Sequence, residues 1–135
     1  MSELVLIDTS AWIHALRKSG PAGPREAVAR LLTERRAATT GMVMLELLGG
    51  TRSRKEYQEL FEDLRSLHDL PVTDETWTAA CLLSHDIRQK GFQIPATDHL
   101  IASVAIANRC ELLHADRHFD LLAKHSRLTV IALRI

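Results

Sequence analysis

Apolar residues form two kinds of run along this chain, and the shorter kind predicts strands. Residues 4–7 are a continuous apolar run that ends at Asp8, Thr9 and Ser10. A run of this length without polar alternation is typical of a central parallel strand covered on both faces. Ligand sites in open parallel sheets form at the carboxyl ends of strands, so we expect Asp8 at the edge of such a site. The three polar residues would equally well cap a following helix, and that alternative stays open.

Longer segments repeat apolar residues at helical spacing. They predict helices over residues 11–18, 25–36, 42–48, from Thr51 or Ser53 to 67, 74–90, 97–108 and 118–125. Shorter runs between them predict further strands at 37–41, 67–72, 111–114 and 128–133. Because helices and strands alternate, we expect an α/β fold in which helices pack on a parallel sheet of about five strands.

Several residues carry specific expectations about burial and backbone shape. Trp77, Ala80 and Cys81 recur at helical spacing and predict a stripe that faces the core. Cys81 and Cys110 lie in apolar patterns without metal or redox spacing, so we expect buried thiols and no disulfide. A glycine of the pair Gly49-Gly50 is expected to end its helix in the left-handed conformation.

Length and composition are those of a globular protein. The 135 residues fit one domain, and 46% apolar with 25% charged residues is ordinary globular usage. Apolar runs stay well short of the ~18 residues that a membrane helix needs. The first apolar run lacks a preceding basic region and is broken by Asp8, so we expect a cytoplasmic protein without a signal peptide or membrane association.

The charge balance gives no global attraction for nucleic acid. Lys plus Arg and Asp plus Glu each number 17, so the formal net charge is zero. Any polyanion must therefore be bound by local basic patches. The candidates are Arg17-Lys18, Arg35-Arg36 and the patch from Arg52 to Lys55.

Two carboxylates stand inside apolar segments. Every neighbour of Glu46 within 42–48 is apolar, so we expect its side chain on or beside a buried face, where it needs an Arg partner or a metal ion. Asp98 opens the strongly apolar helix predicted at 97–108, where the helix dipole favours an acid. Asp98 or Thr97 would serve as the cap of that helix.

A fourth carboxylate repeats the position of Asp8. Asp116 follows the strand predicted at 111–114 as Asp8 follows the first strand, so the two acids should be close if their strands are neighbours. Together with Glu46 and Asp98 they would repel one another, because these stretches offer no matching Lys or Arg. Carboxylates without Cys or well-spaced His indicate magnesium or manganese, and not zinc.

Four motifs occur in order along the chain. They are Leu-Ile-Asp-Thr-Ser-Ala-Trp-Ile at 6–13, Leu-Glu-Leu-Leu-Gly at 45–49, Pro-Ala-Thr-Asp-His-Leu-Ile-Ala-Ser at 95–103 and Leu-Leu-His-Ala-Asp-Arg-His-Phe at 112–119. Together they resemble the PIN domain and, more narrowly, the VapC toxins, which are the ribonuclease halves of toxin–antitoxin pairs. The resemblance implies one PIN-like nuclease domain over 1–135, an α/β/α sandwich with a central parallel sheet of about five strands.

The resemblance also implies roles for individual residues. Asp8, Glu46, Asp98 and Asp116 match the acidic cluster that holds Mg²⁺ or Mn²⁺ and cleaves RNA. Ser10 matches a hydroxyl position that binds a metal-bound water or a phosphate. The expected primary metal ligands are Asp8 and Asp98, with Glu46 and Asp116 acting directly or through water. RNA phosphodiesters would be hydrolysed by a metal-activated water without a covalent intermediate.

The last motif departs from the usual pattern. Many relatives have Thr or Ser two residues before the last acid and another acid two residues after it, where this chain has His114 and His118. Whether His114, His118 or Asp120 completes the site stays open. Charge alone suggests Arg117, with Lys18 and the patch from Arg52 to Lys55, as contacts for the RNA backbone.

Partners and rival functions follow from the same comparison. The resemblance implies a cognate antitoxin and a homodimer. One alternative is a PIN-like domain that binds RNA or protein without cutting. Another is a two-component receiver, which needs a Lys after the last strand, and residues 128–135 contain none.

Overall fold

A five-stranded parallel sheet is the centre of the computed structural model, which describes residues 2–135. The strands are β1 (Val5–Ile7), β2 (Ala37–Thr39), β3 (His68–Asp69), β4 (Glu111–His114) and β5 (Val130–Ala132). Their order across the sheet is β3-β2-β1-β4-β5, and every pairing is parallel. The predicted α/β fold with about five parallel strands is confirmed.

The central strand β1 separates the two halves of the sheet. Val5 pairs with Ala37 on one side and with Glu111 on the other, and Ile7 pairs with Leu113. The chain runs outward from β1 to β3 and then crosses to β4 and β5. This reversal of strand order is a topological switch point, where α/β proteins form their ligand sites.

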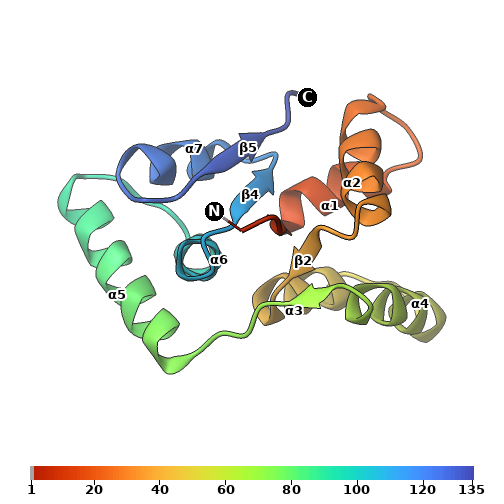
Figure 1. The fold of residues 1–135 in the computed structure, drawn as a ribbon, viewed down its shortest axis with the longest axis horizontal. Helices are drawn as coiled ribbons and strands as arrows, with labels where there is room; N and C mark the ends of the chain where they lie inside the picture. The colour runs from red at the N-terminus through yellow and green to blue at the C-terminus, as the bar shows by residue number, and fades with distance from the viewer. Residues whose placement is uncertain (1) are drawn as a thin grey trace.

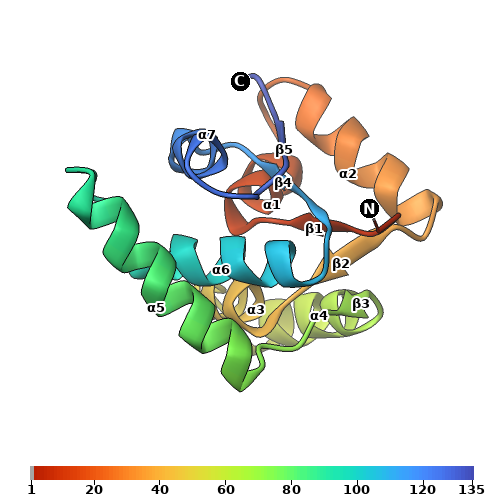
Figure 2. The same cartoon turned by 60° about the vertical axis from the view of Figure 1, so that its left-hand side comes forward.

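Helices cover both faces of the sheet. They are α1 (Thr9–Leu16), α2 (Gly23–Thr33), α3 (Gly41–Gly49), α4 (Arg54–Arg65), α5 (Asp74–Gln89), α6 (Ala96–Ala107) and α7 (Arg117–Lys124). The strands lie between α1 and α2 on one side and α5 and α6 on the other (Figures 1 and 2). Among these helices, none combines the length and hydrophobicity needed to cross a lipid bilayer.

The core is built around β1 and α6. All three residues of β1 are buried, as its continuous apolar run predicts. In α6, every residue from His99 to Ala105 is buried, so this helix is enclosed on nearly all sides. In Figure 2, α6 lies beneath β1, so its enclosed position fixes where its first turn lies relative to the sheet.

The predicted core stripe of α5 is confirmed at Ala80 and wrong at Trp77 and Cys81. Trp77 is 53% exposed and the Cys81 thiol is exposed, whereas Thr76 and Ile87 are buried together with Ala80. At the edge of the molecule α5 packs mainly on α6, so only a narrow stripe of it meets the core (Figure 1). A helix turns by about 100° per residue, so adjacent positions differ in their exposure.

The expectation for the Cys110 thiol is confirmed, whereas the one for the helix end at Gly49-Gly50 is wrong. The Cys110 thiol is buried, as predicted, and no disulfide joins it to Cys81. Gly50, however, ends α3 with φ −90° and not in the left-handed conformation. Its backbone N–H donates to the carbonyls of Leu47 and Leu48, so a right-handed turn satisfies the helix end.

Candidate active site

Asp8 and Asp116 lie side by side at the carboxyl edge of the sheet. Their strands are neighbours, and the backbone N–H of Asp8 donates to the carbonyl of Leu113 over 2.9 Å. Each acid also caps the next helix, because Asp8 Oδ2 accepts from the N–H of Ser10 and Asp116 Oδ1 from that of His118, both at 2.9 Å. The strand-end and capping interpretations are therefore both correct for Asp8, and Asp116 has a capping role that the sequence analysis did not predict.

The Ser10 hydroxyl joins the two strand ends. It donates to Asp8 Oδ2 and accepts from the backbone N–H of Ala115 over 2.9 Å. A hydroxyl oxygen has two acceptor lone pairs, so one remains available for a further donor. Ser10 thus fixes the Asp8 carboxylate relative to the end of β4.

Asp98 is brought to this edge by the first turn of α6. Pro95 precedes the helix and no side chain caps it, so neither Thr97 nor Asp98 is a cap. Instead, Asp98 Oδ2 accepts from His118 Nδ1 over 3.0 Å, and the same nitrogen lies 3.4 Å from Asp116 Oδ1. Within residues 2–135, one ligand atom from each of Asp98, Asp116 and His118 lies within 4.8 Å of the others.

Burial and mutual repulsion raise the pKa of two acids of this cluster, Asp8 and Asp98. Burial raises the pKa of Asp98 to about 6; the hydrogen bond from His118 opposes the change, and the charges of Asp8 and Asp116 add to it. Burial also raises the pKa of Asp8; the hydrogen bonds from Ser10 oppose this, and the charge of Glu46 adds to it. The cluster therefore holds negative charge that its own surroundings do not fully compensate.

Glu46 is exposed, so its predicted burial is wrong. The short helix α3 buries Val43, Leu47 and Leu48, whereas Leu45 is 66% exposed beside Glu46. Of the two expected partners, an Arg or a metal ion, the Arg is not the one that binds Glu46, since Thr9 Oγ1 donates to Glu46 Oε1 over 2.8 Å. This contact holds Glu46 near the start of α1, next to Asp8.

His118 completes the group with Asp98 and Asp116, whereas His114 and Asp120 are not part of it. The buried His114 accepts the N–H of Asp116 at Nδ1 over 3.1 Å, so its proton is on Nε2. That nitrogen lies 3.3 Å from Asp120 Oδ1 without forming a hydrogen bond. Of the three possibilities that the sequence left open, only His118 lies within ligand distance of Asp98 and Asp116.

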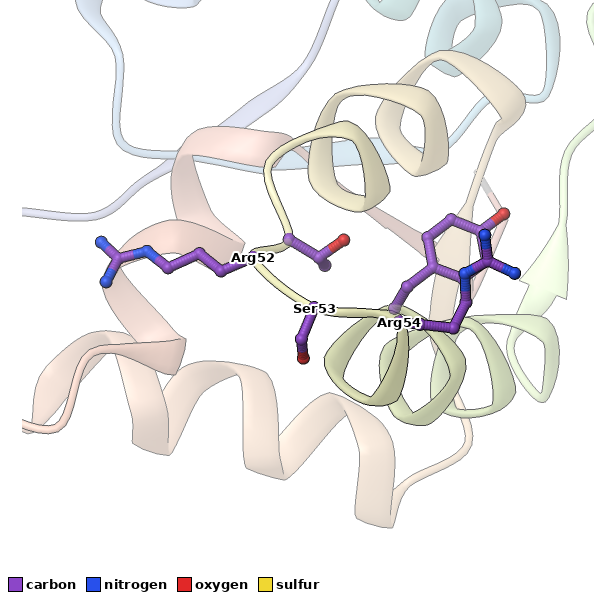
Figure 3. Close-up of a pocket in the computed structure, with 5 residues that line it drawn as sticks. Arg52, Ser53 and Arg54 are labelled. Atoms are coloured by element: carbon purple, nitrogen blue, oxygen red, sulfur yellow. The ribbon is translucent and has the colours of Figure 1, made fainter.

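The basic candidates lie on the surface. Arg117 is exposed at the first position of α7, directly after Asp116. Arg52 and Arg54 border a cavity of about 450 Å³ at the start of α4, and their side chains extend to opposite sides of Ser53 (Figure 3). Of the two predicted starts of this helix, Thr51 and Ser53, it is Ser53 that caps it by accepting the N–H of Glu56.

The donor atoms suit a divalent cation. The carboxylates of Asp98 and Asp116 converge beside His118, and a third carboxylate lies next to them. The raised pKa of Asp98 indicates charge that a cation would neutralise. Carboxylate-rich sites without thiolates are those of magnesium and manganese. The residues present therefore fit a divalent metal at this edge of the sheet.

A model of the PIN domain matches residues 5–125 of this chain. The chain belongs to the PIN domain family. Among curated proteins it is similar to ribonuclease VapC11 of Mycobacterium tuberculosis, with 31% identity over 97% of this chain and all of the relative. Ribonuclease VapC18 of the same organism is 30% identical, over 87% of this chain and 85% of its own.

Solved structures share the fold at lower identity. VapBC2 from Rickettsia felis, bound to a DNA fragment from its promoter, has a TM-score of 0.80 at 22% identity, over 97% of this chain and 99% of that one. FitAcB from Neisseria gonorrhoeae has a TM-score of 0.75 at 19% identity, over 95% and 96% of the two chains. The expected family is thus confirmed by the family model and the relatives, and the expected fold by the solved structures.

Proposed function

We propose that this protein is a VapC-type toxin, an endoribonuclease that depends on a divalent metal ion. The observation that carries the proposal is the convergence of Asp98, Asp116 and His118 beside Asp8 at the switch point of the sheet. The similarity to VapC ribonucleases over nearly the whole chain supports it. The core draws on residues from Val5 to Leu128, which supports a single nuclease domain over 1–135.

The metal ion would be Mg²⁺ or Mn²⁺. Asp98 and Asp116 would hold it directly, Asp8 would contribute from the β1 side, and Glu46 would act through water because it is exposed. When bound, such an ion lowers the pKa of a coordinated water and offsets charge on the phosphate oxygens.

The protein's own residues would orient the reacting groups. Ser10 holds Asp8 in place and keeps one lone pair for a water or phosphate contact. His118 keeps the Asp98 and Asp116 carboxylates together by placing its Nδ1 proton between them. Arg117, exposed beside the cluster, would bind a phosphate of the RNA backbone.

A toxin of this type would be neutralised by a cognate antitoxin protein. Exposed apolar side chains on the early helices offer a docking surface, among them Ile13 and Leu16 of α1 and Leu45 of α3. We also propose that the protein forms a homodimer. It would act in the cytoplasm, where it would encounter its RNA substrate and its antitoxin.

Membership in the PIN domain family removes the receiver-like alternative, and a cleavage assay tests the non-catalytic one. The purified protein should cut single-stranded RNA with Mg²⁺ or Mn²⁺, lose the activity with a chelator, and regain it when metal is restored. Asp98→Asn should lower the rate by about a thousandfold, since it removes a charged ligand. Asp63→Asn, at an exposed acid of α4, is the matched control and should cut normally. Metal-independent cutting, or equal rates for both variants, would contradict the proposal.

A further inference from the structure

A second cavity, of about 620 Å³, adjoins the acidic cluster. Its wall is formed by the end of α5, the segment 92–96, the start of α6 and one residue of α7. His118 belongs both to this wall and to the group with Asp98 and Asp116. Anything bound in the cavity would therefore lie next to the proposed metal site.

The charge of this cavity is opposite to that of the cluster. Its lining contains no carboxylate, and Arg88 supplies a cation from the last turn of α5. Pro95 and Ala96, at the start of α6, are also part of the wall, and no side chain caps this twelve-residue helix. The N–H groups at an open helix start attract anions, and Arg88 adds to that attraction.

His99 supplies an independent sign of a missing ligand. It is 2% exposed and lines the cavity, and its Nδ1 donates to the carbonyl of Pro95 over 3.0 Å. Its Nε2 therefore carries a lone pair, and it has no hydrogen-bond partner within residues 2–135. A buried acceptor of this kind is costly unless a donor reaches it, so the cavity calls for a ligand with a hydroxyl or N–H group.

Phe92 adds a flat apolar surface to the same wall. Its ring packs against the His125 ring with centroids 5.2 Å apart, which restrains its orientation. A fixed aromatic ring beside cationic and hydrogen-bonding groups is suited to an unpaired base of single-stranded RNA.

We propose that this cavity binds the nucleotide next to the cleaved phosphodiester of the RNA substrate. Its phosphate would lie at Arg88 and the open start of α6, and its base against Phe92. Its 2′-hydroxyl or a base N–H would donate to His99. This inference rests on the proposed ribonuclease function and assigns a subsite to it.

The test measures RNA binding apart from cleavage. In the Asp98→Asn background with Mg²⁺, fluorescence anisotropy would follow a labelled single-stranded RNA. Adding Arg88→Gln should weaken binding about tenfold and reduce the slope of log K against log salt by about 0.7, the loss of one phosphate contact. Adding Phe92→Leu should also weaken binding about tenfold, because a stacking surface is removed. Lys90→Gln, an exposed cation near Arg88 that does not line the cavity, is the control and should change binding less than twofold.

Modified substrates distinguish the two possible donors to His99. After sequencing has located the cleaved bond, single 2′-deoxy or base substitutions would be placed at the flanking nucleotides. Weaker binding with one deoxy substitution assigns the 2′-hydroxyl, and weaker binding with one base substitution assigns the base. If neither has an effect at any flanking position, the subsite is overturned.

The outcomes also separate this inference from the proposed function. If Arg88→Gln and Lys90→Gln bind RNA equally while the natural chain cuts it, the subsite is overturned and the ribonuclease stands. If Asp98→Asn binds no RNA and the natural chain cuts none, both proposals fail. Arg88→Gln should keep the full rise in melting temperature with Mn²⁺, because Arg88 does not belong to the group of Asp98, Asp116 and His118.

Discussion

Asp8 and Asp98 are carboxylates at the same edge of the sheet, but they differ in the hydrogen bonds that they accept. Asp8 accepts hydrogen bonds from both the N–H and the hydroxyl of Ser10. Asp98 accepts only the imidazole of His118 among the side-chain hydrogen bonds of residues 2–135. Asp8 is stabilised by its own strand-to-helix junction, whereas Asp98 depends on a neighbour that it shares with Asp116. A cation is therefore needed more at Asp98 than at Asp8.

Position in the local structure explains this difference. Asp8 immediately precedes α1, so its side chain can fold back onto the free N–H groups of the first turn. Asp98 is the third residue of α6, past the cap position, and its carboxylate extends away from the helix toward α7. Capping satisfies the first acid, and only a tertiary contact reaches the second.

Metal binding should give the largest effect in a test of this comparison. At a concentration about a hundred times its dissociation constant, Mg²⁺ or Mn²⁺ should stabilise the natural chain by about 2.7 kcal/mol. Asp98→Asn should lose most of the corresponding rise in melting temperature, Asp8→Asn should keep part of it, and the double variant should show almost none. Thermal melts with and without metal measure this, with Asp63→Asn as the control. Equal rises in the natural chain and the double variant would remove the metal site from this region.

Loss of the Ser10 hydroxyl should have the next largest effect. Ser10→Ala removes a donor from Asp8 and leaves the N–H of Ala115 without its acceptor. The free energy of unfolding should fall by about 1–2 kcal/mol, as measured by urea denaturation. Ser19→Ala, in the exposed loop before α2, should change it by less than about 0.5 kcal/mol. If the two variants are equally stable, the bridge between β1 and β4 contributes nothing.

The pH dependence of stability should give the smallest effect. The folded state raises the pKa of Asp98 from 3.8 to about 6, so in metal-free protein this group binds a proton more readily when folded. Its contribution to stability is greatest below pH 3.8 and is lost as the pH rises through 6. Asp98→Asn removes this loss and should be more stable than the natural chain by about 1 kcal/mol at pH 8, after allowance for screening by solvent.

The difference between the two proteins should shrink as the pH falls from 6 to below 3.8, where Asp98 is protonated in both the folded and the unfolded natural chain. Urea denaturation in a chelator at several pH values measures it. A large loss of stability in Asp98→Asn at every pH would mean that Asp98 stabilises the fold and is not held under repulsion.

Local patterns were sufficient where an element is covered on both faces. The unbroken apolar run of β1 allows one interpretation only, and the bounds predicted for β4 are those observed. The start of α5 at Asp74 was also predicted, and the start of α4 was narrowed to Thr51 or Ser53, because side-chain capping depends on neighbours in sequence. These features involve short-range contacts, which the order of residues specifies directly.

Local patterns failed where an element has one covered face. The apolar segment around Glu46 does not specify which side of α3 meets the core, and Leu45 is exposed beside it. The same uncertainty placed Trp77 in the core although it is 53% exposed. A helix with apolar residues on several faces can pack through any of them, and its neighbours decide which one.

The sequence by itself determined that acids follow β1 and β4 and that an acid begins α6, because strand ends and helix starts are set by runs of neighbouring residues. Only the tertiary structure decided that His118 joins Asp98 and Asp116, that Glu46 is held by Thr9, and that a cation-lined cavity adjoins the acids. Those contacts join residues that are distant along the chain, and the packing of α6 and α7 at the sheet's edge fixes them.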